Sequence, residues 1–383
     1  MNNCILVFST NIWKWGCERS TCSLCDYLQK QGYKVIAIIP RKGEIIELFQ
    51  EIKVDYIISD FSNIIYCDDG EKRIGQLIKM KIRYKIKEYW NLRAIKNKII
   101  RSGYNPVLVY SNTILFNTGI KIAKIFKIPH VQHMRENIDA FHYKYLCGYK
   151  RAMKLINKHS VCVLCTCTAI KKRYENDIDV KKMNVVYNGV QPCDLKINKK
   201  KEIIVQILQV SRYMDDKRIM DTLQSVKILK EKGYDNFHID IYGQGEEEEL
   251  YVNYINEYKL SDKVTLKGFS NNIPFQNYQI GLMTSTFEAF ARTTLDYMNN
   301  ALAVIASDSG GNVEQVINNE TGLLFEVKNP ISLSEKIAFL IKNTDKINEF
   351  GNNGRRYFMN NFTQENFQKK AGKLVLSCIK SNV

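Results

Sequence analysis

The sequence predicts an α/β protein of two doubly wound domains, and three observations lead to this prediction. The chain has 383 residues, which is long for one domain and sufficient for two. Residues 5–39 have the pattern of a strand, a helix and a second strand, and residues 281–306 repeat that order. With 45% hydrophobic and 25% charged residues, the composition is that of a globular protein able to bury two cores.

The composition also bears on the compartment. No apolar stretch approaches the roughly 18 residues that cross a bilayer. The first residues contain only a strand-length apolar run without a charged start, which does not fit a secretory signal. Eleven scattered cysteines fit reduced thiols, so we expect a cytoplasmic protein. Cys22 and Cys25 form a CxxC, but no second pair accompanies them, which favours buried thiols over a zinc site.

The elements of the first half can be assigned in order. The strand at 5–9 is followed by a loop ending at Gly16, then by a helix that ends near Gly32 and by the strand at 35–39. The other predicted elements of this half are strands at 55–59, 105–111, 130–136 and 161–166, and helices ending at Lys127 and Tyr174. Residues 191–201, with a proline and a lysine cluster, have the composition of a linker.

The strand at 130–136 carries the first candidate site residues. Alternation along a strand places His133 and Arg135 on one face, toward the carboxyl end where α/β domains bind ligands. Either residue could instead be an ordinary residue at the end of a strand.

Half of the net charge lies in one segment. The formal charge of the chain is +16, and residues 78–101 contain nine basic residues against one acid, Glu88, which gives +8. Length and lack of breakers favour a helix, and the interleaved Tyr84, Tyr89 and Trp90 fit an anionic membrane interface. The alternative is a solvated helix face that covers the sheet. Nucleic-acid binding is not expected, because the segment has no helix-turn-helix, finger or RNA-binding signature.

The second half continues the pattern of strands with polar ends. A strand at 203–210 is followed by two cations, Arg212 and Lys217. Further strands at 237–242 and 264–269 end in turns, and helices are expected after Pro330 and from Gln364 to Ile379.

The stretch 281–325 carries the strongest functional signal. A strand ends at Ser285, and a helix begins near Thr293 or Thr294. Free backbone N–H groups at the start of a helix suit a phosphate, and carboxylates at Glu288 and Asp296 can accept hydrogen bonds from sugar hydroxyls. This loop could therefore hold an anion and a carbohydrate together. Alternatively, Glu288 is a surface charge and Asp296 is half of a capping arrangement.

These residues resemble the donor-site motif of retaining glycosyltransferases of family 4, which have the GT-B fold of two Rossmann-like domains facing across a cleft. The run STFEAFARTTLDYMNNALAVIASDSGGNVE carries the resemblance, and the segments TGLLF and NGV support it. The family has glutamate at both ends of its motif, whereas the second acid here is Asp296. Ala289 and Ala291 stand where the family often has glycine.

The resemblance implies three groups of site residues. The catalytic group would be Glu288, Arg135 and His133; the donor diphosphate would bind Arg212, Lys217, Gly16, Arg292 and Thr293; and Asp296, Gly243 and Phe269 would surround the nucleoside. No metal or other cofactor is expected, because the two cations after the strand at 203–210 can replace the charge of a metal. Residues 1–191 would bind the acceptor and 192–363 the nucleotide-sugar, while the helix in 364–383 would cross back to the N-terminal domain.

The resulting hypothesis is a retaining, metal-independent glycosyltransferase. It would use a nucleotide-diphosphate sugar, UDP in preference to GDP, and a saccharide acceptor, lipid-linked, in the synthesis of bacterial capsule, O-antigen or another cell-surface polysaccharide. It would be cytoplasmic and peripheral on the inner face of the membrane. Two alternatives stay open: a non-catalytic nucleotide-sugar-binding partner, and a nucleotide-sugar 2-epimerase of the same fold, which would need acid and base carboxylates but no acceptor.

Overall fold

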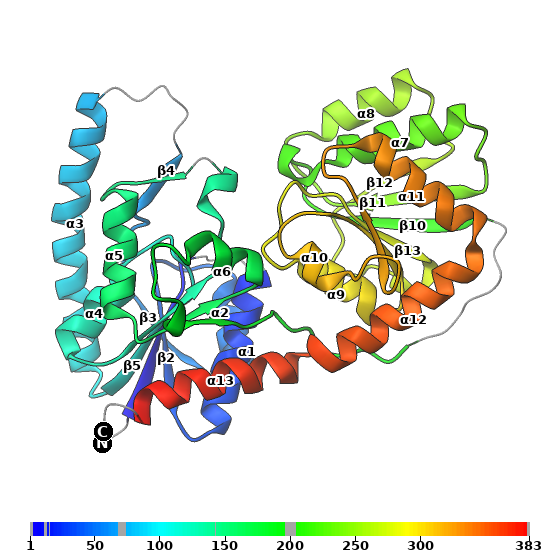
Figure 1. The fold of residues 1–383 in the computed structure, drawn as a ribbon. Helices are drawn as coiled ribbons and strands as arrows, with labels where there is room; N and C mark the ends of the chain where they lie inside the picture. Colours follow the sequence, from blue (N-terminus) through cyan, green and yellow to red (C-terminus); the bar gives the residue numbers. More distant parts are fainter. Residues whose placement is uncertain are drawn as a thin grey trace. The chain divides into compact units, whose positions relative to one another are not determined.

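The computed structural model describes residues 3–10, 14, 16–67, 74–141, 143–195 and 204–380. It divides the chain into two compact units (Figure 1). The first unit consists of residues 1–188 with 365–383, and the second consists of residues 189–364. None of the described helices is long and apolar enough to cross a membrane.

The first unit is built on a parallel sheet of seven strands in the order β3-β2-β1-β5-β6-β8-β9. Its strands are β1 (Asn3–Phe8), β2 (Lys34–Ile39), β3 (Asp55–Ile58), β5 (Asn105–Ser111), β6 (His130–Met134), β8 (Cys162–Cys165) and β9 (Met183–Val185). Its helices are α1 (Gly16–Lys30), α2 (Ile45–Glu51), α3 (Ile74–Arg101), α4 (Thr118–Phe126), α5 (Tyr149–His159), α6 (Thr168–Tyr174) and α13 (Gln364–Lys380). A small antiparallel pair joins β4 (Ile65–Cys67) to β7 (Tyr143–Tyr145).

Both faces of this sheet are buried, which explains why its strands β1 and β2 are apolar along most of their length. Along β1, Ile5 and Val7 pack in one core with α1, α2 and α13, whereas Leu6 and Phe8 pack on the opposite face with α3 and α4. A parallel sheet covered on both faces requires such continuous apolar runs instead of alternation. Cys25 of α1 is fully buried in the first of these cores.

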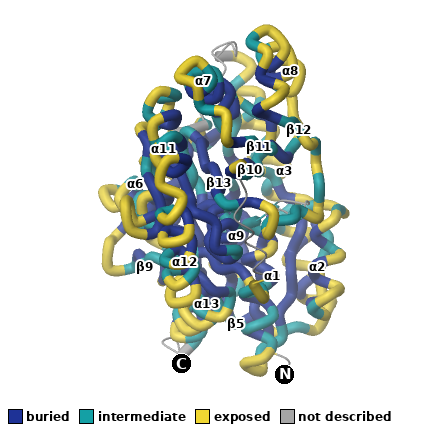
Figure 2. The backbone as a smooth tube through the Cα atoms, turned by 90° about the vertical axis from the view of Figure 1, so that its right-hand side faces the viewer, coloured by how far each residue is buried: buried dark blue, intermediate teal, exposed yellow. Residues whose placement is uncertain are grey.

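The second unit is built on a parallel sheet of six strands in the order β12-β11-β10-β13-β14-β15. Its strands are β10 (Val205–Val210), β11 (Phe237–Tyr242), β12 (Val264–Gly268), β13 (Ile280–Met283), β14 (Ala303–Ser307) and β15 (Gly322–Phe325). Its helices are α7 (Ile219–Glu231), α8 (Glu248–Glu257), α9 (Arg292–Asn299), α10 (Asn312–Gln315), α11 (Pro330–Lys342) and α12 (Thr344–Asn361). The central strands β10, β11 and β13 are mostly buried (Figure 2).

The predicted class, α/β with doubly wound parallel sheets, is confirmed. Counted from β10, the strand order of the second unit is 3-2-1-4-5-6, in which the order of the strands reverses between β10 and β13. In the first unit the same reversal lies between β1 and β5. In such sheets ligands bind beyond the carboxyl ends of the strands at this switch point, so each unit has one expected ligand site.

Element boundaries differ from the predictions by a few residues. Helix α9 begins at Arg292, just before the predicted start at Thr293 or Thr294, and α3 begins at Ile74 instead of residue 78. Strand β6 ends at Met134, so Arg135 follows the strand instead of lying within it. Residues 196–203, which include most of the predicted linker, lie outside the described part of the chain.

Candidate functional site

The switch point of the second unit brings Lys217 and Glu288 together. Lys217 ends the 3-10 turn Asp215–Lys217 after β10, and Glu288 lies in the loop between β13 and α9. Lys217 Nζ lies 2.7 Å from Glu288 Oε1 and 3.2 Å from Asp216 Oδ2. The two paired side chains are only 13% and 22% exposed, so the ion pair is largely shielded from water.

The electrostatics keep Lys217 charged. Burial opposes the charged form, but Glu288 and Asp216 outweigh this effect and raise the pKa of Lys217 above its ordinary value. A fixed ammonium at a strand-to-helix junction is suited to binding an anion. An incoming anion would compete with Glu288 for this ammonium.

The glycine loop after β14 supports the backbone of Glu288. Gly311 N donates a 2.7 Å hydrogen bond to Glu288 O. At Gly310, where φ is +59°, a Cβ atom would lie 2.1 Å from the same carbonyl oxygen, so only glycine fits. Ser309 Oγ donates to Thr286 O at 2.7 Å. The SDSGG segment of the sequence therefore fixes the position of the loop that carries Glu288.

The other residues predicted to bind the diphosphate have different surroundings. Arg212 is exposed immediately beyond β10. Arg292 Nη1 donates a 2.9 Å hydrogen bond to Gly189 O, so its guanidinium holds the start of the second unit. Thr293 is half-buried in the first turn of α9. Their diphosphate contacts stay predictions, as does that of Gly16, the first residue of α1 in the first unit.

The predicted nucleoside residues lie at the carboxyl edge of the same sheet. Phe269 follows β12 and is 63% exposed, which leaves its ring available for stacking. Gly243 follows β11, and a Cβ atom there would lie 1.8 Å from Ser211 O, so its glycine is required by the close approach of two loops. Asp296 is half-buried on α9.

In the first unit, Arg135 is the centre of a buried polar network at the switch point. It is 6% exposed, and its Nε donates to Asn112 Oδ1, which follows β5, at 2.8 Å. Its Nη1 donates to Asn188 Oδ1 at 2.8 Å, and Ser20 Oγ of α1 donates to the same oxygen at 3.2 Å. Arg135 Nη2 is buried without a hydrogen-bond partner among the described residues. This nitrogen is a donor that a ligand hydroxyl could satisfy.

His133 lies beside this network as a neutral imidazole. Its side chain is fully buried, and burial together with the Arg135 charge lowers the pKa of His133 well below 6.5. Its Nδ1 lies 2.5 Å from Tyr110 Oη, while Nε2 has no partner in the described part of the chain. With Tyr110 as the donor, Nε2 carries a hydrogen and can donate to a ligand oxygen.

Sequence reasoning missed several residues of this network. Glu18 is fully buried in the first turn of α1, where it accepts from Ser9 Oγ at 3.4 Å and Cys17 Sγ at 2.6 Å. An acid in the first turn of a predicted helix, directly after a strand and its loop, was the available signal. Asn112 also follows a predicted strand and could have been noted for the same reason.

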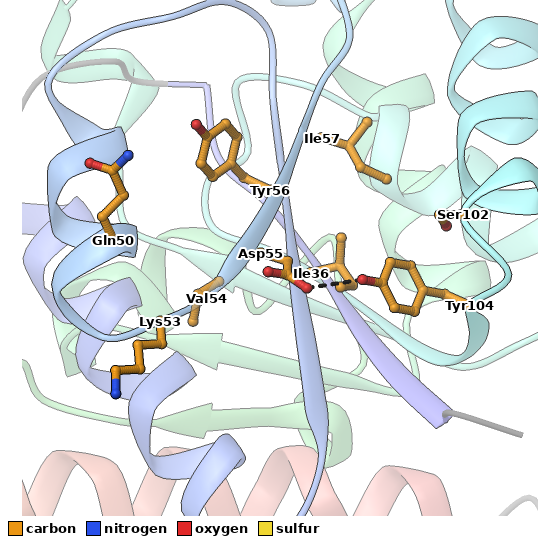
Figure 3. A pocket seen from close by; sticks show the side chains of 9 residues that line it. All are labelled: Ile36, Gln50, Lys53, Val54, Asp55, Tyr56, Ile57, Ser102 and Tyr104. Atoms are coloured by element: carbon orange, nitrogen blue, oxygen red, sulfur yellow. Dashed lines mark hydrogen bonds between the residues drawn. The ribbon is translucent and has the colours of Figure 1, made fainter.

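A cavity at the amino end of the sheet of the first unit does not belong to the candidate site. It has a volume of about 530 Å³ and is lined by residues near the amino ends of β3 and β5 (Figure 3). Tyr104 Oη donates to Asp55 Oδ2 at 2.9 Å inside it, and Lys34 Nζ lies 2.5 Å from the same carboxylate oxygen. Asp55 is thus satisfied by its neighbours, and the cavity lies away from the carboxyl ends where α/β sheets bind ligands.

Two known families match the sequence, one in each half of the chain. Residues 16–192 match the family described as Glycosyltransferase Family 4, and residues 191–357 match the family described as Glycosyl transferases group 1. A poly(ribitol-phosphate) alpha-N-acetylglucosaminyltransferase of Staphylococcus aureus is 26% identical over 77% of this chain and 61% of its own length. The capsular polysaccharide biosynthesis glycosyltransferase CapM, also of Staphylococcus aureus, is 28% identical over 41% of this chain and 42% of its own length. The chain thus spans less than two thirds of both relatives.

Solved structures share the fold. HepE of Anabaena, in complex with UDP and glucose, has a TM-score of 0.75 and 17% identity, and the match covers 97% of this chain and 99% of HepE. The two family matches adjoin and together extend from residue 16 to residue 357. The likeness in fold agrees with the two parallel sheets described above. The chain therefore belongs to the glycosyltransferases of group 1 and family 4, whose fold is GT-B.

Proposed function

We propose that this protein is a retaining glycosyltransferase that moves a sugar from a UDP-sugar to a saccharide or polyol-phosphate acceptor of a bacterial surface polymer. The observation that carries the proposal is the shielded Lys217–Glu288 pair at the switch point of the second unit. Two relatives, one named for poly(ribitol-phosphate) and one for capsular polysaccharide, support the acceptor class. HepE was solved with UDP and glucose, which makes UDP the first nucleotide to test.

In the proposed reaction, Lys217 and Arg212 stabilise the charge that develops on the departing nucleotide diphosphate. The bond between the anomeric carbon and the phosphate oxygen breaks, and a bond to the acceptor oxygen forms on the same face. The leaving diphosphate takes the acceptor proton. When the diphosphate binds Lys217, the carboxylate of Glu288 becomes available to the hydroxyl groups of the sugar.

The first unit would supply one neutral and one cationic hydrogen-bond donor to the hydroxyl groups of the substrates. Arg135 Nη2 and His133 Nε2 are buried nitrogens without partners among the described residues, and both can donate to sugar hydroxyls. No metal enters this scheme, because the cations of the second unit carry the charge compensation. If chelation of divalent ions abolished transfer, this part of the proposal would be wrong.

We also propose that α3 holds the protein at an anionic membrane, where a lipid-linked acceptor would be found. Ile78, Ile82, Ile86, Tyr89 and Trp90 recur along one side of the helix and are 53–60% exposed. An amphipathic helix with basic residues around exposed aliphatic and aromatic side chains is suited to lie in a membrane interface.

Product analysis tests the proposal. The protein is incubated with a panel of UDP- and GDP-sugars and with poly(ribitol-phosphate) or capsular oligosaccharide, and the anomeric configuration of the product is read by proton NMR. We expect one UDP-sugar to give an α-linked product from an α-linked donor. A changed nucleotide-sugar formed without acceptor would indicate the epimerase instead. Donor binding without any turnover, in the presence of all acceptors, would indicate the non-catalytic partner.

A further inference from the structure

We propose that a cationic pocket beside α3 binds the phosphodiester headgroup of an anionic glycerophospholipid. The pocket has a volume of about 510 Å³ and is lined by residues of α3, of the start of α4 and of the start of α5. These three helices belong to the first unit (Figure 1). This volume is within the range of small-molecule sites. The proposal rests on the membrane contact of α3 and names the lipid group that would be recognised.

The pocket carries more cations than its own acid can neutralise. Four basic residues line it, Lys81 and Lys85 from α3, Lys121 from α4 and Arg151 from α5, together with one acid, Glu88. Lys121 is paired with Glu88. Within the described ranges, the other three cations have no acidic partner. The excess of three positive charges therefore faces the pocket and suits an anion from outside the protein.

The acid of the pocket is fully engaged within the protein. The Tyr84 hydroxyl donates to one carboxylate oxygen of Glu88, and Lys121 contacts the other. Burial and the Glu88 charge raise the pKa of Tyr84, so the hydroxyl keeps its proton and remains a donor. Tyr84 Oη also lies 3.2 Å from Asn117 Oδ1, which joins α3 to the start of α4. Both carboxylate oxygens of Glu88 thus have partners other than the three unpaired cations.

The position of the pocket beside an apolar stripe favours a lipid over a free anion. Lys81 and Lys85 are four residues apart and lie one turn from each other, next to the exposed Ile78, Ile82 and Ile86. A soluble phosphate gains no favourable contact from exposed aliphatic side chains, whereas a phospholipid presents acyl chains and a phosphodiester side by side. Cations at the edge of an apolar helix face match that arrangement in charge and in polarity.

The test uses dihexanoyl phosphatidylglycerol below its micelle concentration, titrated calorimetrically into the full chain. The pocket variant is Lys85→Gln with Arg151→Gln. The matched control is Lys79→Gln with Arg83→Gln, which removes two charges from α3 at positions that do not line the pocket. We expect at least tenfold weaker binding in the pocket variant and less than twofold in the control, because charges that contact the headgroup act at short range whereas charges that do not contact it are screened. Thermal unfolding of both variants checks that they fold.

Several outcomes would overturn the proposal. Equal losses in the two variants would indicate a diffuse surface charge, and an absence of binding by the wild type would remove the site. Inorganic phosphate that binds as tightly as the lipid would indicate a free-phosphate site instead.

UDP-induced thermal stabilisation of the same variants keeps this proposal separate from the proposed function. None of the residues that line the pocket is a candidate donor-site residue, so UDP should stabilise both variants as it does the wild type. If the wild type binds the lipid as expected but does not bind UDP, the proposal of a UDP-dependent glycosyltransferase would be refuted and the proposal of a lipid pocket supported. Failure to sediment with phosphatidylglycerol vesicles, with the soluble lipid still bound, would refute the α3 contact alone.

Discussion

Replacing Lys217 by methionine should weaken both the fold of the second unit and the binding of UDP. The ammonium has carboxylate oxygens at 2.7 Å and 3.2 Å, and the pair with Glu288 is mostly buried. Removing one partner of a fully buried pair costs about 3–5 kcal/mol, and partial exposure here reduces the expected loss to about 1–3 kcal/mol of unfolding free energy. Loss of one charge-assisted hydrogen bond to the diphosphate, worth about 1.5–3 kcal/mol, should weaken UDP binding by about 10- to 150-fold.

The variant Glu288→Gln should behave differently. It removes the acid that competes for Lys217, so UDP should bind as tightly as to the wild type or more tightly, while sugar transfer is lost. In the double variant the two stability losses should not add, because each single variant already breaks the same ion pair.

Urea unfolding and UDP titration on the four proteins measure these effects. The exposed Lys232, also in the second unit, gives a control variant, Lys232→Met, which should leave both measurements within experimental error. UDP binding that is unaffected in Lys217→Met would refute the assignment of the diphosphate to this lysine. Weaker UDP binding in Glu288→Gln would contradict the competition between the carboxylate and the diphosphate.

Three further outcomes are expected. Gly310→Ala should lower the unfolding free energy by about 1–3 kcal/mol and reduce transfer, because its Cβ would strike the Glu288 carbonyl. In urea unfolding, the control Gly75→Ala, in open space on α3, should leave the unfolding free energy unchanged or raise it by up to about 1 kcal/mol. Burial lowers the pKa of His130 to about 3 and that of His133 well below 6.5, so the unfolding free energy should fall as pH drops below about 6.5, by up to about 1.4 kcal/mol per pH unit for each histidine. His130→Gln should reduce this slope in urea unfolding measured between pH 7.5 and 4.5. Arg135→Lys should abolish most transfer while UDP still stabilises the protein, because a single ammonium cannot replace the hydrogen bonds to Asn112 and Asn188; a fully active variant would contradict this.

The fold could be predicted because strands such as β1, β2 and β14 are apolar runs followed by polar loops, and helical segments separate them. The candidate donor residues could be named from their types and from the family resemblance, but the pairing of Lys217 with Glu288 could not. These residues are 71 positions apart, and only the reversal of strand order places their loops side by side. The buried Glu18 was missed because an acid in the first turn of a helix is usually solvated, and its burial depends on the loops that follow neighbouring strands.

Helix α12 shows another limit of sequence patterns. Its sequence contains several asparagines and the glycines Gly351 and Gly354, which disfavour a helix. In the structure, a Cβ atom at Gly351 would lie 2.2 Å from Ala301 O, so glycine is required for the helix to pack against its neighbour. Tertiary packing here overrides the local preference of the chain, and no local pattern reveals it.

Helix α13 has a consequence for the synthesis of the protein. Phe367, Ala371 and Val375 of this helix complete one core of the first unit, whose strands all precede residue 189. On the ribosome, the part of that sheet face that α13 covers therefore stays exposed while residues 189–364 are translated, for roughly 9–35 s at about 5–20 residues per second, although α1 and α2 already cover the rest of the face. The second unit is itself being synthesised in this interval, so the unit that emerges first is completed only after α13 has been made. Its exposed apolar face would be the part of the nascent chain most in need of a chaperone.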